Sequence, residues 1–275
     1  MNGSGGLSAG QYQAIADFLE RQAGIRLGIG KEYLVVSRLG HLLREHGLAD
    51  FDALAARLAP GADRTLHAAV VDAMTTNETF WFRDPAHYRI LVESLLPEHA
   101  GGRMRIWSAA VSTGQEAYSI LFSLDEAQQR GQCPPGASWE VLGTDISPSA
   151  LAQARAGRYC GVAASRGLTV EQRRRFFLDD DQGCIEVQPE FRRQVRFREF
   201  NLLDDFASLG RFDVIFCRNV LIYFSQERKR DILERFHAAL APGGALFIGS
   251  TESMSDHSDL FRMERHGTGL VYRRN

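Results

Sequence analysis

In this chain, two apolar segments are each followed by an acidic residue. These two acids are the first residues that indicate chemistry. Residues 104–120 are typical of a strand, a tight turn through Gly114 and a helix, the unit with which doubly wound sheets bind nucleotide-like ligands. A second apolar run, Val141-Leu-Gly-Thr, ends in Asp145. A carboxylate at a strand tip can accept both hydroxyls of a ribose, so the pattern predicts a nucleoside-cofactor site.

The residues of the turn favour one cofactor over another. A dinucleotide site would show Gly-x-Gly-x-x-Gly, whereas Ala110-Val-Ser-Thr-Gly114 has a single glycine and is followed by Glu116. A carboxylate would repel a pyrophosphate but attract a cationic sulfonium with an α-ammonium group. We therefore expect S-adenosylmethionine, with Glu116 paired to the methionyl amine and Asp145 to the ribose. Two plainer interpretations remain open: Glu116 as a solvated acid in the first turn of a helix, and Asp145 as a helix cap before Pro148.

Two domains are expected to position these residues. Leu7 to about Ala73 reads as helical almost throughout, with Ser8 and Asp50 as helix caps and Gly24, Gly47 and Pro60-Gly61 as breaks. Residues 1–75 are therefore predicted to form a small all-α domain. From residue 76 to 275 strands alternate with helices, which predicts a mostly parallel α/β sheet covered on both faces and closed by an antiparallel last strand. The expected strands are Arg105–Ala109, Val141–Thr144, Val195–Phe200, Phe212–Cys217 and Ala245–Gly249.

One stretch interrupts the alternation. Phe176-Phe-Leu and Cys184-Ile-Glu-Val flank an acidic, glycine-containing turn, which predicts a small β-hairpin inserted at about residues 172–199.

Composition and sequence pattern exclude several classes of protein. The chain has 275 residues, 44% of them hydrophobic and 24% charged, with a net charge of −2, which gives no reason to expect nucleic-acid binding. No apolar run approaches the ~20 residues of a membrane span, and the first residues lack a signal-peptide pattern. The four cysteines show no paired spacing for zinc or redox work, and Cys217 is expected in the core. A reducing, cytoplasmic compartment is predicted.

Five motifs occur in an order that is more specific than any of them alone. They are Thr75-Thr-Asn-Glu-Thr-Phe-Trp-Phe-Arg83, Trp107-Ser-Ala-Ala-Val-Ser-Thr-Gly, Gly143-Thr-Asp-Ile-Ser, Asn201-Leu and Cys217-Arg-Asn-Val-Leu-Ile-Tyr-Phe224. In these motifs, and over nearly its whole length, the chain resembles the CheR family, the chemoreceptor glutamate methyltransferases of bacterial chemotaxis. It departs from the family at Gly114-Gln-Glu-Ala117, where Gly-Glu-Glu-Pro is usual.

The resemblance implies both the site and the reaction. It implies methyl transfer from S-adenosylmethionine to receptor glutamates, with S-adenosylhomocysteine as the product and no metal. Arg83 and Tyr223 would be catalytic, placed beside the methyl group. The cofactor would be bound by Asn77, Thr79, Arg83, Glu116, Asp145, Asn201, Leu202, Asn219 and Val220.

Plainer roles are open for several of these residues. Arg83 could be a surface cation paired with Asp84, Tyr223 a half-buried aromatic residue, and Asn219 a cap or turn residue. Val220, Leu221 and Ile222 are expected in the core. Because a glutamate carboxylate is ionised near pH 7, with a reference pKa of ~4.3, no histidine is needed as a base, and His87 is expected at the surface.

The resemblance also implies partners. Arg38 and Arg44 would dock the helical domain on the cytoplasmic helical domain of chemoreceptors, and the hairpin could bind a receptor C-terminal peptide by strand addition. A solvated helix face is the alternative for the two arginines. Direct membrane insertion is not expected, and a monomer is the default. Two other functions remain: a methyltransferase of another substrate class, and a cofactor-bound adaptor without turnover.

Overall fold

The computed structural model describes residues 7–99, 102–254 and 257–275 and separates the chain into two compact units. One unit comprises residues 1–76 with 223–228, and the other residues 77–222 with 229–275. In the first unit, the helices of residues 7–76 are α1 (Ala9–Ala23), α2 (Glu32–Glu45), α3 (Phe51–Arg57) and α4 (Arg64–Met74). Ser8 caps α1 with a capping box and Asp50 caps α3, which confirms both predicted caps. Ile15, Phe18 and Leu19 of α1 are fully buried, as their spacing on one helix face predicts.

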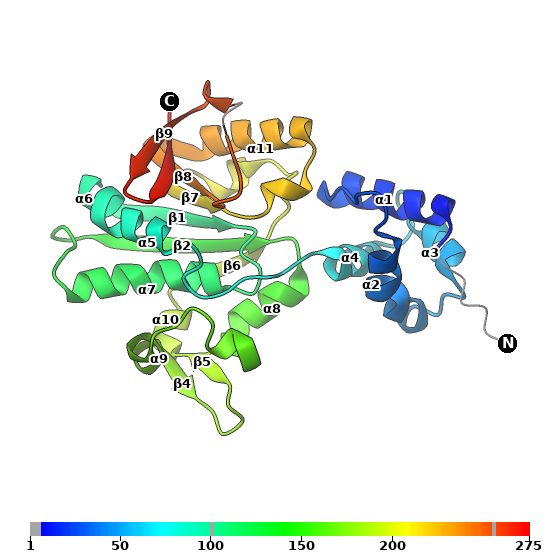
Figure 1. Ribbon diagram of the computed structural model, residues 1–275, viewed down its shortest axis with the longest axis horizontal. Helices are drawn as coiled ribbons and strands as arrows, with labels where there is room; N and C mark the ends of the chain where they lie inside the picture. The colour runs from blue at the N-terminus through cyan, green and yellow to red at the C-terminus, as the bar shows by residue number, and fades with distance from the viewer. Residues whose placement is uncertain (1–6, 100–101, 255–256) are drawn as a thin grey trace. The chain divides into compact units, whose positions relative to one another are not determined.

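The second unit is built on a seven-stranded sheet in the order β6-β2-β1-β7-β8-β10-β9 (Figure 1). Its strands are β1 (Arg103–Ala109), β2 (Ser138–Asp145), β6 (Val195–Glu199), β7 (Phe212–Cys217), β8 (Leu240–Ile248), β9 (Phe261–His266) and β10 (Gly269–Arg274). The first five pair in parallel, while β10 pairs antiparallel with both β8 and β9. This confirms the predicted α/β sheet with an antiparallel end.

The order of the strands determines where a ligand can bind. The chain runs from β1 outward to β2 and β6, then returns to β7 on the other side of β1. The order therefore reverses between β1 and β7, and ligands of open α/β sheets bind beside the carboxyl ends of strands at such a switch point. The loops after β1, β2, β6, β7 and β8 all leave from this edge.

Helices cover both faces of the sheet. α7 (Gln115–Gln129) lies on one face and α11 (Gln226–Ala239) on the other (Figure 1). Trp107 of β1 points to the α11 face, where its ring meets Phe236 at 5.2 Å, while its neighbour Ser108 reaches Glu116 of α7. The remaining helical segments are α5 (Pro85–Ile90), the π-helical η1 (Leu91–Leu95), α6 (Leu96–Glu98), α8 (Pro148–Ala156), and the 3₁₀ turns η3 (Phe206–Leu209) and η4 (Leu221–Tyr223).

The predicted hairpin is present and is part of a three-stranded sheet in the order β3-β5-β4. β4 (Phe177–Asp179) and β5 (Ile185–Val187) form the hairpin, and β3 (Arg158–Tyr159) pairs antiparallel with β5. Around them lie η2 (Gly161–Ala164), α9 (Val170–Phe176) and α10 (Pro189–Arg192). β3 was not predicted, because a strand of two residues leaves no periodic pattern in the sequence.

The cysteines, which show no paired spacing for redox work in the sequence, nevertheless include one bonded pair. Cys160 and Cys184 are joined by a disulfide across 24 residues of sequence, because the pairing of β3 with β5 brings them together. Cys217 is fully buried in β7, as predicted, and Cys133 is also a free thiol. Among the helices of the described residues, none is both long enough and apolar enough to cross a membrane.

At Gly167, the loop that precedes α9 packs closely on the core. Its φ is +94°, and a Cβ added there would lie 2.0 Å from the carbonyl oxygen of Trp81. We expect Gly167→Ala to lower the free energy of unfolding by about 3 kcal/mol, since backbone strain and a clash with backbone add. Gly131→Ala is the matched control, because φ is +68° and the added Cβ meets no atom within 4 Å. Urea unfolding measures the free energy of unfolding of both variants. Equal losses of this free energy would show that glycine is needed at position 167 only for its positive φ, and not for the close contact with Trp81.

Candidate active site

Asp145 is held rigidly at the carboxyl edge of the sheet. Its Oδ2 accepts the backbone N–H of Ser112 at 2.7 Å, and its Oδ1 accepts the N–H of Ser147 at 2.9 Å. The side chain that caps α8 belongs to Ser147, so the alternative role of Asp145 as that helix cap is wrong. With only 6% of its surface exposed, Asp145 joins the turn after β1 to the end of β2.

The segment that carries Asn77 is bound to the same turn. The hydroxyl of Ser112 donates to the carbonyl oxygen of Asn77 at 2.9 Å, and the Asn77 amide reaches Ser147 Oγ at 3.5 Å. Further along the segment, Phe82 N–H donates to Ser119 Oγ of α7 at 3.0 Å. Asn77 and Asp145, which are far apart in sequence, therefore lie at one edge, while their contacts with the cofactor stay predictions.

Backbone strain gathers in the same loops. In the described part of the chain, five residues other than glycine have positive φ: Phe82, Asp84, Ala110, Ser112 and Asn219, with φ between 50° and 59°. All five lie in the motif segment that ends near residue 83, in the turn after β1, or directly after β7. Such conformations cost about 1–3 kcal/mol each and concentrate at functional sites.

A buried charge cluster lies between these loops. The Arg218 guanidinium donates to Glu116 Oε2 at 2.7 Å, to Asp84 Oδ2 at 2.5 Å and to the carbonyl oxygen of Arg83 at 2.7 Å. Glu116 Oε1 accepts the Ser108 hydroxyl at 2.7 Å. Glu116 is only 8% exposed, so the interpretation of a solvated acid is wrong. Asp84 is paired with Arg218, and the charge of Arg83 also lowers its pKa, so the alternative that Arg83 pairs with Asp84 stays open.

The cluster changes the acidity of its members. Burial alone would raise the pKa of Asp84, but the hydrogen bond and charge of Arg218 outweigh it and bring that pKa below its ordinary value. Burial, followed by the charge of Arg218, lowers the pKa of His87 to about 4, although the charge of Asp84 acts in the opposite direction. His87 is 5% exposed, with its ring 5.0 Å from that of Phe247, so the expected surface position is wrong. With two carboxylates to one guanidinium, Asp84, Glu116 and Arg218 carry a formal charge of −1.

Glu252, which sequence reasoning missed, joins the ends of β7 and β8. Its Oε2 accepts the backbone N–H of Asn219 at 2.8 Å and of Gly249 at 2.7 Å. Asn219 Oδ1 and Glu252 Oε1 are buried and accept no hydrogen bond from the described residues. An acid three residues after the end of the predicted strand at Ala245–Gly249 was the available signal. Arg218 was also missed, although a charged residue directly after an apolar strand marked it.

The other predicted residues are placed as follows. Asn201 follows β6, and its Oδ1 accepts the N–H of Leu203 at 3.0 Å, while Leu202 is 6% exposed. Thr79, Arg83 and Val220 are partly buried. Arg83 lies over the ring of Phe80 at 5.6 Å. Leu221 is buried as expected, but Ile222 is 58% exposed, so its assignment to the core is wrong.

Tyr223 and the two predicted docking arginines belong to the helical unit. Within that unit, the Tyr223 carbonyl oxygen accepts the N–H of Arg26 at 3.0 Å. Arg83 lies in the other unit, and the position of both residues beside the methyl group stays a prediction. Arg38 donates to the carbonyl oxygens of Met74 and Thr75 at 2.9 and 2.8 Å and so binds the end of α4, whereas Arg44 is exposed.

Comparison with known proteins decides the family. Residues 77–269 match the model of the CheR methyltransferase SAM-binding domain, and residues 10–75 match that of the CheR methyltransferase all-alpha domain. The chain belongs to the CheR methyltransferase family. A chemotaxis protein methyltransferase of Vibrio parahaemolyticus is 46% identical over 97% of this chain and 98% of that protein. Chemotaxis protein methyltransferase 1 of Pseudomonas aeruginosa is 45% identical over 95% of this chain and 97% of that protein.

The residues at this edge fit the cofactor of a SAM-binding domain. S-adenosylmethionine carries an ammonium group and a sulfonium, and the edge offers a cluster of formal charge −1 together with two buried oxygens, Asn219 Oδ1 and Glu252 Oε1, that accept no hydrogen bond from the described residues. The fixed carboxylate of Asp145 supplies acceptors for hydroxyl groups. A pyrophosphate, by contrast, would find acceptors where it needs donors.

The Arg218 cluster yields a stability prediction. Arg218→Met leaves the buried Glu116 and the half-buried Asp84 without their partner, so we expect it to cost about 3–5 kcal/mol of unfolding free energy. Adding Glu116→Gln should recover part of that loss, because one unpaired charge is removed.

Arg230→Met is the matched control, since Arg230 also binds two carboxylates, Glu234 and Asp259, but at the exposed surface. It should change the urea midpoint far less than Arg218→Met does. Equal effects of the two variants would show that burial does not set the strength of the Arg218 cluster.

The lowered pKa of His87 predicts that the stability of the protein depends on pH. Because its folded pKa of about 4 lies below its ordinary 6.5, the unfolded chain binds the proton first, and stability falls as pH drops below about 6.5. Between pH 7.5 and 5.5 the loss should be about 1 kcal/mol, and His87→Gln should remove most of it. Urea unfolding of both proteins at the two pH values measures this, and an unchanged pH dependence in the variant would contradict it.

Proposed function

We propose that this chain transfers the methyl group of S-adenosylmethionine to glutamate side chains of bacterial chemoreceptors and gives glutamyl methyl esters. The observation that carries the proposal is the similarity to chemotaxis protein methyltransferases over almost the whole chain, both domains included. A relative from Salmonella typhimurium, 37% identical over 91% of this chain and 86% of that protein, supports the same class.

Within the proposal, the cofactor is held at the carboxyl edge of the sheet. Asp145 accepts the ribose hydroxyls, and the negative charge of the Glu116, Arg218 and Asp84 cluster attracts the methionyl ammonium. Asn77, Thr79, Asn201, Leu202, Asn219 and Val220 complete the site. To the predicted set we add Glu252, because its Oε1 is a buried acceptor beside Asn219 that receives no hydrogen bond from the part of the chain that the structure describes.

The bound cofactor supplies an electrophilic methyl group on a cationic sulfur. The substrate carboxylate is already ionised near neutral pH, so the chain has no proton to remove. Its contribution is to align the two reactants and to strip water from the carboxylate, which can supply ~7–11 kcal/mol in well-oriented pairs. In this mechanism Arg83 orients the substrate carboxylate through a forked hydrogen bond, and Tyr223 lies near the sulfonium. The cytoplasm is the proposed compartment.

Two surfaces are proposed to bind the receptor. Arg44 of α2 is exposed and can contact an acidic helix, whereas Arg38 already donates to carbonyl oxygens at the end of α4. We therefore assign docking mainly to Arg44 and give Arg38 a supporting role. In the small sheet β4 is an edge strand, and an extended receptor peptide could add to it.

Transfer of labelled methyl from S-adenosylmethionine to purified receptor cytoplasmic domains tests the function. We expect base-labile label on receptor glutamates and about 100-fold less of it with Arg83→Ala, because small misplacements of a reactant cost that much. Arg130→Ala is the control, since Arg130 lies exposed at the end of α7 and pairs only with Glu126 among the described residues.

Calorimetric titration with S-adenosylhomocysteine separates the possible failures. A chain that binds it but labels no receptor would overturn the proposal in favour of a cofactor-bound adaptor. Label that resists base, or that persists when the receptor glutamates are changed to glutamine, would show that the product is not a glutamyl ester.

A further inference from the structure

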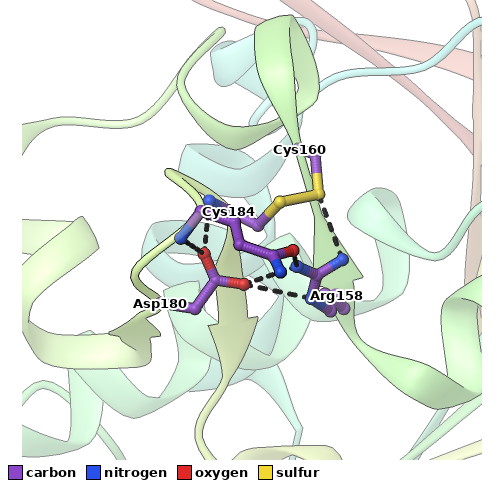
Figure 2. The surroundings of a disulfide bond; sticks show 5 residues. Arg158, Cys160, Asp180 and Cys184 are labelled. Carbon is purple, nitrogen blue, oxygen red and sulfur yellow. Dashed lines mark hydrogen bonds and ion pairs between the residues drawn. A yellow bond between two sulfur atoms is a disulfide. The ribbon is translucent and has the colours of Figure 1, made fainter.

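The disulfide closes the small sheet at a position that solvent can reach. Figure 2 shows the disulfide between Cys160 and Cys184. Cys160 directly follows β3 and is exposed, while Cys184 directly precedes β5 and is 5% exposed. Disulfides of cytosolic proteins are mostly transient and redox-sensing rather than permanent. For a chain whose relatives are chemotaxis methyltransferases, this bond calls for a chemical explanation.

The side chains around Cys160 favour reactivity. Arg158 donates to Cys160 Sγ at 3.4 Å and is itself fixed by Asp180 Oδ2 at 2.6 Å, as Figure 2 shows. A neighbouring guanidinium stabilises a thiolate, which is the reactive form of cysteine. On the other side, Asp180 Oδ1 accepts the Cys184 N–H at 2.8 Å and so keeps the second sulfur in place. After reduction, Cys160 would be an accessible thiolate with its resolving partner close by.

The residues beside Cys160 are bonded to the loops of the candidate cofactor site. The hydroxyl of Tyr159 donates to the carbonyl oxygen of Thr113, in the turn after β1, at 2.8 Å. Its ring meets Trp81 at 4.8 Å, and Trp81 Nε1 donates to the carbonyl oxygen of Ala163 at 2.8 Å. The disulfide therefore constrains a short segment, residues 159–163, that contacts both the turn after β1 and the segment ending at Arg83.

We propose that Cys160 and Cys184 form a reversible thiol–disulfide site that sets the affinity for the cofactor. In the disulfide state the bond holds Tyr159 and Ala163 against the two loops, and S-adenosylmethionine and its product bind tightly. In the dithiol state the segment is freed from β5 and the affinity falls. The inference goes beyond methyl transfer and does not depend on which substrate is methylated.

The chemistry balances with a low-molecular-weight thiol such as glutathione as the reductant. Its thiolate attacks the exposed Cys160 sulfur, the bond between the two cysteine sulfurs breaks, and Cys184 leaves as a thiolate that takes up a proton. A second thiolate attacks the sulfur that glutathione contributed to the mixed disulfide and releases Cys160. The protein gains two electrons, two glutathione molecules become one oxidised molecule, and the reverse sequence closes the bond.

The test uses the full chain equilibrated in glutathione buffers from fully reduced to fully oxidised. Acid quenching and alkylation in denaturant should give two labels per chain when oxidised and four when reduced, because the chain has four cysteines and one disulfide. Calorimetry with S-adenosylhomocysteine should show about fivefold weaker binding in the reduced state. By linkage, saturating S-adenosylhomocysteine must shift the thiol–disulfide equilibrium towards the disulfide by the same factor.

Variants localise the effect. Cys160→Ser and Cys184→Ser should bind S-adenosylhomocysteine as the reduced chain does in every buffer, whereas Cys133→Ser should keep the redox dependence. Tyr159→Phe, which removes the hydrogen bond to Thr113, should shrink the difference between the two states.

Two results would overturn the proposal. One is a bond that stays closed in every glutathione buffer, which would make it a permanent structural link. The other is an affinity equal in the two states, which would uncouple the cysteines from the cofactor site. Neither result bears on receptor methylation, so failure here and failure of the proposed function are distinguishable.

Discussion

The buried guanidinium of Arg218 is the constraint on which the active-site edge depends. A charge removed from water must be paired and hydrogen-bonded, otherwise the desolvation cost is several kcal/mol. Arg218 follows β7, Glu116 opens α7 and Asp84 precedes α5, so satisfying one side chain fixes three elements that are distant in sequence. The positive φ of Asp84 and Asn219, on either side of this contact, is strain that the cluster offsets.

The chain's apolar periodicity was enough to predict the sheet, because period-two and helical patterns are set by burial within single elements. The caps at Ser8 and Asp50 and the five parallel strands follow from such local signals. The resemblance added the family and the site residues, among which Asn77 and Asp145 do meet at one edge. Neither composition nor spacing alone could have supplied that set.

What the sequence could not predict depends on contacts between distant elements. His87 was expected at the surface because a histidine beside charged residues has no local sign of burial, and only the packing of α5 on Phe247 buries it. Cys160 and Cys184 have no motif spacing, since the two-residue strand β3 creates their proximity. Arg218 and Glu252 likewise acquire their roles only when the ends of neighbouring strands meet.

The balance of donors and acceptors distinguishes this edge from that of a dinucleotide-binding sheet. A pyrophosphate site presents unpaired N–H groups at a glycine-rich turn. Here Asp145 already accepts the N–H groups of Ser112 and Ser147, and Glu252 those of Asn219 and Gly249. The carboxylates bind the backbone N–H donors of this edge and leave hydrogen-bond acceptors in excess. The two acids, Glu116 and Asp84, also outnumber the one base, Arg218. The same strand order can therefore select a cation, because charge and hydrogen-bonding capacity at the turn, rather than topology, choose the ligand.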